Sequence, residues 1–183
     1  MAWNSDVLAV YSLENNGNDD TTNAYNGTAS GTPRYTSKNK YEGTYSVNTN
    51  GGYITLPAGL LSDLSSATEY TIELRYKPVI NELAALIGGA GTNDNANQFG
   101  MYGYLNKFHI RYNNLTILDC GALTVGSWQR LSIEYKDVAG TKTLKTYING
   151  TLTYSGTPNN NVFGVAGITS INIMRANGWT YTF

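Results

Sequence analysis

The stretch GSWQRLSIEYKDVAGTKTLKTYINGTLTY, residues 126–154, decides the fold of this chain. From Arg130 to Tyr135 polar and apolar residues alternate, which is typical of a strand with one buried face. A second β-prone run, 144–149, ends in Asn149-Gly150, which favours a type I′ hairpin turn because both central residues then need φ > 0. The stretch therefore predicts three consecutive antiparallel strands. The turn predicts the cross-strand pairs Ile148–Thr151, Tyr147–Leu152 and Lys145–Tyr154.

The composition is that of an all-β protein with little charge. Charged residues make up 14% of the 183 positions, against about 25% in an average protein. The 20 Gly and 15 Tyr residues suit short strands and tight turns. Hydrophobic residues, at 41%, are too frequent for a disordered chain. The formal net charge of −1 and the lack of a basic patch argue against nucleic acid as a partner.

The cysteine content and the N-terminal residues indicate which cellular locations to expect for this chain. Cys120 is the single cysteine, so neither an internal disulfide nor a cysteine-based zinc site is expected. We interpret it as a small buried hydrophobic residue. Residues 1–6 lack the basic and apolar regions of a signal peptide, and no apolar run is long enough to cross a membrane. We therefore expect no signal peptide in this chain and no membrane insertion.

Short β-prone runs separated by turn signals continue through the rest of the chain. Leu60, Leu61 and Leu64 have helical spacing and predict one short helix at 59–66. A turn at 50–52 is expected to join the two strands beside it. Regularly spaced strands predict an all-β, antiparallel two-sheet jelly-roll sandwich with at most one short helix, a single domain over residues 1–183. The expected strands are 7–13, 45–47, 53–56, 70–77, 83–87 (with a helical turn as the alternative), 99–104, 107–112, 115–118, 168–175 and 179–183.

A polar loop is expected from Glu14 to Thr32. It contains Asn16-Gly17, Asp19-Asp20 and Asn26-Gly27. Loops of this composition either only turn or hold a cation through oxygen ligands, and the spacing does not match an EF-hand. We interpret the repeated Asn-Gly pairs as turn residues.

No catalytic constellation is apparent in the sequence. Glycoside hydrolysis needs two carboxylates about 5–9 Å apart. The available pairs, Glu69 with Glu73 and Glu134 with Asp137, are more typical of solvated strand faces. His109 is the single histidine and has no neighbouring nucleophile motif, so a catalytic triad is unsupported. The sequence therefore predicts a protein that is not an enzyme.

Tyrosines on the predicted strands are the candidate ligand contacts, because sugars stack on exposed aromatic rings. We predict ligand contacts at Tyr104 and Tyr147. We add His109 and Arg111, which share one face of the strand at 107–112. The alternative is that these side chains form ordinary polar strand faces or cover interfaces. The tyrosines considered, of which some must face outward, are Tyr102, Tyr104, Tyr112, Tyr147 and Tyr154.

The central stretch has the pattern G-x-W-x-x-L-S-I-x-Y at residues 126–135, followed by Y-I-N-G at 147–150. It resembles the centre of a laminin-G-like, concanavalin A-like jelly-roll domain. The resemblance implies two stacked antiparallel sheets and a role in glycan or protein binding. In some members it implies a calcium site, for which Asp20 is the matching residue. We expect Trp128 to lie in the core. Further matching residues are Tyr11, Leu13, Asp20, Asn26, Gly27, Gly43, Ser46, Gly52, Tyr53, Ile54 and Thr71 to Leu74.

The chain departs from this family at its C-terminal end. The family usually continues into a Phe-Gly turn and an acidic closing strand beside the first strand, and neither is found before Phe183. Either the closing strand is replaced, or the edge of the strand expected at 7–13 is left for another chain. An exposed apolar edge favours aggregation unless it is paired.

Two functions fit these observations. The first is a non-catalytic module that recognises glycans at a cell or virion surface, with Ca²⁺ as the one candidate cofactor. The alternative is a structural virion module, such as a decoration, fibre or adhesin domain of a bacteriophage. Such a module would contact neighbouring protein chains in a homo-oligomer or a larger assembly. Both functions predict an extracellular or virion-surface location.

Overall fold

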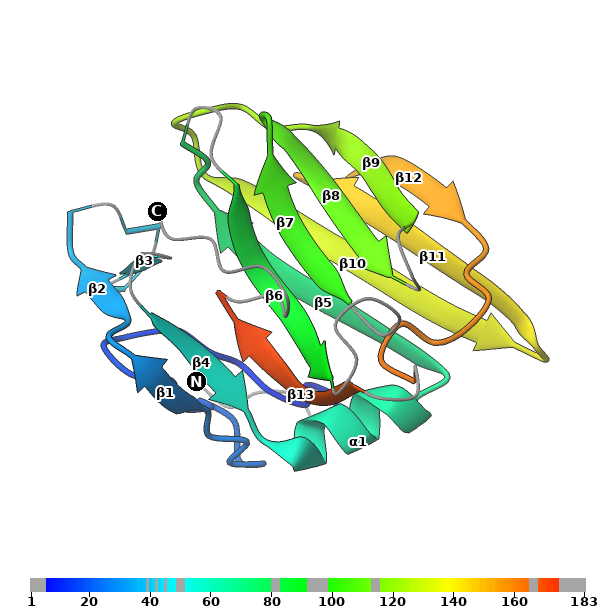
Figure 1. The fold of residues 1–183 in the computed structure, drawn as a ribbon, viewed down its shortest axis with the longest axis horizontal. Coiled ribbons are helices and arrows are strands. Elements are labelled where there is room, and N and C mark those ends of the chain that lie inside the picture. Colours follow the sequence, from blue (N-terminus) through cyan, green and yellow to red (C-terminus); the bar gives the residue numbers. More distant parts are fainter. Residues whose placement is uncertain are drawn as a thin grey trace.

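The computed structural model describes residues 6–38, 40–41, 43–44, 46–48, 52–79, 83–91, 99–112, 116–164 and 168–174. Two antiparallel sheets stack face to face in it (Figure 1). The larger sheet has the strand order β1 (Thr28–Gly31), β4 (Gly52–Leu56), β13 (Ile168–Ile173), β6 (Ala84–Gly91), β7 (Gly100–Tyr104), β8 (Lys107–Tyr112) and β9 (Thr116–Ala122). The smaller sheet has the order β12 (Thr151–Gly156), β11 (Thr141–Ile148), β10 (Gln129–Val138) and β5 (Glu69–Tyr76).

Two smaller elements complete the described fold. β2 (Arg34–Thr36) and β3 (Ser46–Asn48) form a separate two-stranded sheet, and α1 (Ala58–Ser66) is the one helix in the described ranges. In Figure 1 β7 and β8 lie in front of β10 and β5, and α1 lies below β13. No helix in the described part of the chain is long and apolar enough to cross a bilayer. The architecture is an all-β jelly-roll-type sandwich, as the sequence predicts.

The core lies between the two sheets and follows the alternation of β10. Leu131 and Ile133 are 0% exposed, and Tyr135 stacks on Tyr70 of β5 with ring centroids 5.1 Å apart. The helix predicted at 59–66 is confirmed, and it buries its three leucines on the side where it contacts β13. Cys120 is also fully buried, which raises the pKa of its thiol to about 11 and makes it a core residue as predicted.

The central hairpin is confirmed, with one correction to its register. Asn149 and Gly150 have φ of 53° and 83°, as a type I′ turn requires. The first two predicted pairs across the turn are present. The third is wrong, because a β-bulge at Thr153 places Tyr154 opposite Thr146 and Ser155 opposite Lys145. The extra residue is held in place by its hydroxyl, which lies 3.0 Å from the Thr146 hydroxyl.

The N-terminal strand prediction is wrong. Residues 7–13 belong to no strand in the described part of the chain, and Leu13 at their end has a φ of 58°. Their backbone is tied to the acidic loop instead: Val10 N–H donates to Asp19 Oδ1 at 2.9 Å, and Asp20 N–H donates to the Val10 carbonyl at 2.8 Å. The end of the predicted loop, in contrast, forms β1, which pairs with β4.

Two further predictions need correction. The strands beside residues 50–52 do not form a hairpin, because β3 pairs with β2 while β4 lies between β1 and β13. Trp128 is half-buried rather than in the core, and its ring meets exposed Tyr41 edge-on with centroids 5.9 Å apart. The strand expected at 179–183, and with it the question of a closing strand, lies outside the described residues.

Two glycines of the polar loop are required by packing rather than by turns. Neither Gly17 nor Gly27 has a positive φ. Gly17 O accepts a hydrogen bond from Gly27 N–H at 2.9 Å, and both residues lie against Ile54 of β4. A Cβ on Gly17 or Gly27 would come within 2.8 Å or 2.5 Å of Ile54 Cγ2. The absence of side chains at these positions lets the loop pack closely on the fully buried Ile54.

We predict that Gly27→Ala destabilises the protein by about 1–3 kcal/mol through overpacking against Ile54. Gly140→Ala is the control, because a Cβ there meets nothing within 4 Å and only the φ of 86° opposes it, at a cost of about 1 kcal/mol. Urea denaturation measures both. The double variant Gly27→Ala, Ile54→Ala should lose less stability than the sum of the losses measured for the two single variants. A loss equal to that sum would contradict the packing argument.

Candidate functional site

The β7–β8 hairpin places the predicted ligand-binding residues on one face of the larger sheet. Its turn residues Leu105 and Asn106 have φ of 47° and 59°, and the register pairs Tyr102 with His109 and Tyr104 with Lys107. The inner side of the hairpin faces β5, since a Cβ on Gly103 would lie 2.8 Å from the Tyr76 hydroxyl.

The outer side of the β7–β8 hairpin carries polar and aromatic side chains, because the apolar side chains of β8 point inward and pack in the core. Phe108 and Ile110 are 0% exposed and belong to the core. Successive strand side chains point to opposite faces, so the residues between them point away from the smaller sheet. The hairpin turn is anchored by Leu123 N–H, which donates to the Asn106 carbonyl at 2.8 Å. We call this surface the β8 face: Tyr102, Tyr104, Lys107, His109, Arg111 and Asp119.

An aromatic stack lies at the centre of the β8 face. The rings of Tyr102 and His109 are 5.3 Å apart and nearly parallel, at 17°. The Tyr104 ring lies 6.3 Å from His109 at 49° and is 42% exposed, whereas Tyr102 is 3% exposed. His109 Nδ1 is buried and has no hydrogen-bond partner in the described part of the chain. The stack therefore offers an exposed ring beside an imidazole.

Charged groups flank this stack. Lys107 forms an ion pair with Asp119 of β9, which lies opposite His109 in the register. Hydrogen bonds from the Lys107 ammonium and from Gly121 N–H, the latter 3.1 Å long, hold the pKa of Asp119 below its usual range. Arg111 lies at the other end of β8 and is only 8% exposed. The β8 face thus combines aromatic rings with a row of basic side chains.

Tyr147 lies on the other sheet, so the structure does not bring it to the β8 face. Its hydroxyl donates to Glu134 Oε2 at 2.9 Å on the outer side of β10 and β11. The hydrogen bond with this carboxylate is the main cause of the raised pKa of Tyr147. Of the four predicted ligand-binding residues, Tyr104, His109 and Arg111 share the β8 face, with Tyr104 near His109 and Arg111 at the other end of β8.

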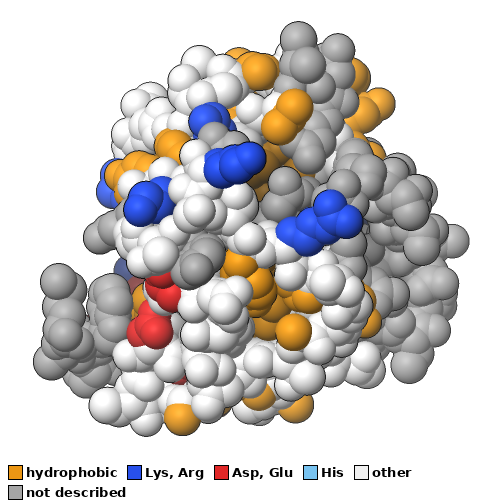
Figure 2. Space-filling view, turned by 90° about the vertical axis from the view of Figure 1, so that its left-hand side faces the viewer, with side chains coloured by type: hydrophobic (Ala, Val, Ile, Leu, Met, Phe, Trp, Pro, Cys, Tyr) orange, Lys and Arg blue, Asp and Glu red, His pale blue; other side chains and the backbone are white. Residues whose placement is uncertain are grey.

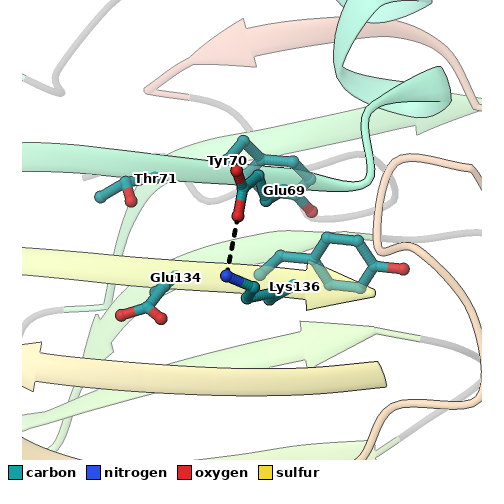
Figure 3. Close-up of a pocket in the computed structure, with 6 residues that line it drawn as sticks. Glu69, Tyr70, Thr71, Glu134 and Lys136 are labelled. Atoms are coloured by element: carbon teal, nitrogen blue, oxygen red, sulfur yellow. Dashed lines mark ion pairs between the residues drawn. The ribbon is translucent and has the colours of Figure 1, made fainter. Parts of the chain in front are cut away.

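Every carboxylate on the strands of the smaller sheet is ion-paired. Glu69 meets Lys136 at 3.1 Å across a shallow hollow that is also lined by Tyr70, Thr71, Glu134 and Tyr135 (Figure 3). The other pairs are Glu73 with Arg75 and with Arg130, both at 3.6 Å, Asp137 with Lys142 at 3.3 Å and Glu134 with Lys145 at 3.7 Å. The arrangement is that of a solvated strand face with matched charges, not of a carboxylate pair facing a substrate.

Asp19 and Asp20 of the acidic loop differ in role. Asp19 is 8% exposed and accepts hydrogen bonds from Val10, Thr21 and Tyr25 backbone N–H groups, each 2.9 Å long. Burial alone would raise its pKa, but these bonds and one from the Thr21 hydroxyl outweigh burial and lower the pKa. Asp19 therefore holds the loop together, a role that the sequence analysis left open between turn and cation site.

Asp20 is the exposed member of the pair, and its Oδ2 accepts one bond, from Ser12 N–H at 3.2 Å. Within the described ranges no three His, Cys, Asp or Glu side chains are grouped as metal ligands. Calcium binding at Asp20 stays a prediction, since backbone carbonyls and amide side chains also serve as calcium ligands.

The side of the molecule where β1 to β4 lie shows how the remaining charge is distributed. Figure 2 shows Lys and Arg side chains around an apolar hollow, separated from one another by neutral surface, with acidic side chains gathered apart from them. No functional residue predicted from the sequence is placed by this view. The charge is spread thinly there, in keeping with the 14% of residues that are charged.

Comparison with known proteins finds solved structures that share the fold but finds no matching sequence family. No family model and no curated protein matches the sequence. The CBM40 carbohydrate-binding module of Ruminococcus gnavus IT-sialidase, solved with α2,3-sialyllactose, superposes with a TM-score of 0.51 at 18% identity, over 62% of this chain and 69% of that chain. An endo-β-1,4-glucuronan lyase from the fungus Trichoderma reesei gives 0.53 at 11% identity, over 79% and 74%.

Botulinum neurotoxin type C has the same architecture in part of its chain. Cell entry of this toxin is dependent upon interaction with two ganglioside molecules. Its structure superposes with a TM-score of 0.58 at 14% identity, over 97% of this chain and 44% of that chain. At these identities the likeness shows a shared β-sandwich of jelly-roll type. The solved structures that share this fold include binding modules and an enzyme, and the laminin-G-like resemblance stays a prediction.

We predict that the acidic loop makes stability depend on pH below about pH 4. In the folded chain the pKa of Asp19 is lower than the ordinary value of an aspartate. Its contribution is therefore complete above that value and is lost as the pH falls through the folded-state pKa. Asp19→Asn should cost about 1–3 kcal/mol at pH 7 and should flatten this acid-side loss. Chemical denaturation between pH 7 and pH 2 measures the change.

The control for this prediction is Asp20→Asn, which removes one charge from the adjacent, exposed position. It should change stability by less than about 0.5 kcal/mol. An Asp19→Asn variant as stable as the parent at neutral pH would contradict the structural role given to Asp19.

Proposed function

We propose that this protein is a non-catalytic glycan-binding module that holds its ligand on the β8 face. The observation that carries the proposal is the exposed Tyr104 ring beside His109, with basic side chains on either side of them. Sugar rings pack their apolar faces on aromatic side chains, while charged and amide groups bind their hydroxyls. The proposed location is a cell or virion surface, with glycans as partners.

Structures with this fold support a binding role. One is a carbohydrate-binding module in complex with sialyllactose, and another belongs to a toxin whose cell entry depends on gangliosides. The glucuronan lyase shows that the fold also carries enzymes. On the described part of the β8 face Asp119 is the one carboxylate and it is ion-paired with Lys107, so the pair of carboxylates that a glycoside hydrolase uses is not found there.

A glycan array tests the proposal, with the purified chain in calcium and again in chelator. Binding in both conditions supports a glycan-binding module without a metal requirement. Binding that is lost in chelator supports the same function and directs attention to Asp20, whose Asp20→Asn variant should then reproduce the loss. Absence of binding in both conditions, by protein shown to be folded, contradicts the proposal.

We predict that Tyr104→Ala weakens binding of an array-positive glycan between about twofold and tenfold, the range expected for loss of one aromatic contact. Tyr147→Ala is the matched control, because it removes a half-exposed tyrosine from the outer side of the smaller sheet. Titration calorimetry measures both affinities. A larger loss in the Tyr147 variant would move the site to the other sheet.

A second candidate function is favoured by the edge strand β12. Its sequence, TLTYSG, contains no charge, and Leu152 on it is 51% exposed. No strand in the described ranges pairs with its second edge. Natural edge strands normally carry charges or proline that block pairing with another chain. A structural module of a virion or fibre would use such an edge to contact a second copy.

We predict for this second candidate that light scattering after size exclusion finds an oligomer and that Leu152→Lys dissociates it. Val138→Lys is the control, since Val138 is equally accessible, at 57% exposed, but lies at the end of β10 away from that edge. A monomer at every concentration would remove the second candidate and leave the glycan-binding proposal in place.

A further inference from the structure

We infer that the outer face of the smaller sheet carries a second binding site, which takes an acidic side chain of a partner protein. We call this site the arginine corner: Tyr41, Glu73, Arg75, Trp128 and Arg130. The inference goes beyond the proposed glycan-binding function, because the β8 face belongs to the other sheet. It comes from two arginines that face each other across β5 and β10, and from the aromatic rings beside them.

The strands of the smaller sheet contain five cations and four carboxylates. Each of the three lysines faces a carboxylate of its own, in the pairs Lys136–Glu69, Lys142–Asp137 and Lys145–Glu134. Arg75 and Arg130 instead share Glu73, each at 3.6 Å. The one excess positive charge on these strands therefore lies at the arginine corner.

The two arginines are direct neighbours across the sheet, since the register places Arg130 opposite Arg75. Gln129 and Leu131, on either side of Arg130, are 4% and 0% exposed, and Tyr76 beside Arg75 is buried. Both arginines therefore point outward. Side chains directly opposite each other have Cβ atoms about 4.5–5.5 Å apart, and like charges at such positions repel. A further anion between the two guanidinium groups would reduce this repulsion.

The two guanidinium groups also have hydrogen-bond donors to offer. Their ion pairs with Glu73 are longer than a hydrogen bond. Neither guanidinium donates a hydrogen bond within the part of the chain that the structure describes. The side chains of Arg75 and Arg130 are 35% and 40% exposed, so a ligand can reach them. Because a guanidinium presents paired N–H donors that match a carboxylate, the arginine corner can bind a second carboxylate beside Glu73.

Two aromatic rings beside the arginines favour a protein as the source of that carboxylate. Arg75 Cζ lies 4.8 Å from the centroid of the Tyr41 ring, which the half-buried Trp128 ring meets edge-on. Tyr41 is 50% exposed, so its ring is open to contact. Trp, Tyr and Arg are the residue types most enriched among the side chains that dominate protein–protein binding energy. An acidic side chain with apolar neighbours would contact both the arginines and the rings.

An NMR titration of the isotope-labelled chain with two matched peptides tests the inference. The acidic probe is acetyl-Gly-Leu-Glu-Leu-Gly-amide, and the neutral probe has Gln in place of Glu. The side-chain N–H signals of Arg75, Arg130 and Trp128 report binding at the arginine corner. At low salt we expect the acidic probe to bind at least about tenfold more tightly, the effect of one hydrogen-bonded contact between charged groups. The preference should shrink as ionic strength rises, since salt screens charge pairs.

Variants separate binding at the arginine corner from a purely structural role of its ion pairs. Arg75→Gln and Arg130→Gln should bring the affinity for the acidic probe toward that for the neutral probe. Glu73→Gln should instead tighten binding of the acidic probe, because it removes the carboxylate that competes for the same guanidinium groups. Lys145→Gln is the matched control, since Lys145 lies on the same face with a carboxylate of its own, and it should change the preference by less than about twofold.

Equal affinity for the two peptides would overturn the inference, as would failure of both to bind at the highest soluble concentration. A preference that survives in both arginine variants, or weaker acidic-probe binding in Glu73→Gln, would also overturn it. Sialyllactose is the third probe and presents a carboxylate on a sugar. If it shifts the Arg75 and Arg130 signals at lower concentration than the acidic peptide does, the occupant is a saccharide and the assignment to a protein is overturned. None of these outcomes decides the function of the β8 face, which the glycan array tests separately.

Discussion

The burial of Phe108 and Ile110 of β8 between the two sheets is the constraint on which the rest of the structure depends. Both side chains are fully excluded from solvent, and removing either from the core would cost several kcal/mol, about 2–5 by analogy with large-to-small substitutions. Because side chains alternate along a strand, this burial determines that Lys107, His109 and Arg111 face outward. The same interaction that stabilises the sandwich therefore builds the proposed site.

The strongly periodic part of the fold could be predicted from the sequence, and the non-local part could not. The alternation from Arg130 to Tyr135 and the Asn149-Gly150 turn are local signals, and β10 and the β11–β12 hairpin follow from them. The extra residue Thr153 in β12 is not a local signal, because a bulge depends on what the neighbouring sheet accommodates. The same holds for residues 7–13, whose apolar sequence suits a strand but whose backbone is tied to Asp19.

The candidate site was predictable to the same extent. Alternation in β8 is sufficient to place His109 and Arg111 on one face, and the β7–β8 turn brings Tyr104 near His109. Lys107 could have been added by the same rule. Asp119 could not, since its pairing with His109 depends on the register of β9. Tyr147 of β11 lies on the smaller sheet, and the sequence alone does not state which sheet each strand joins.

The central claim is that the β8 face binds the glycan, and the most direct measurement is a titration of isotope-labelled protein with sialyllactose, followed by amide chemical shifts. The account predicts that the largest changes are at Tyr104, His109 and Arg111 and their neighbours on β7 and β9, while β10 and β11 change little. Changes concentrated on the smaller sheet around Tyr147, with the β8 face unaffected, would contradict it.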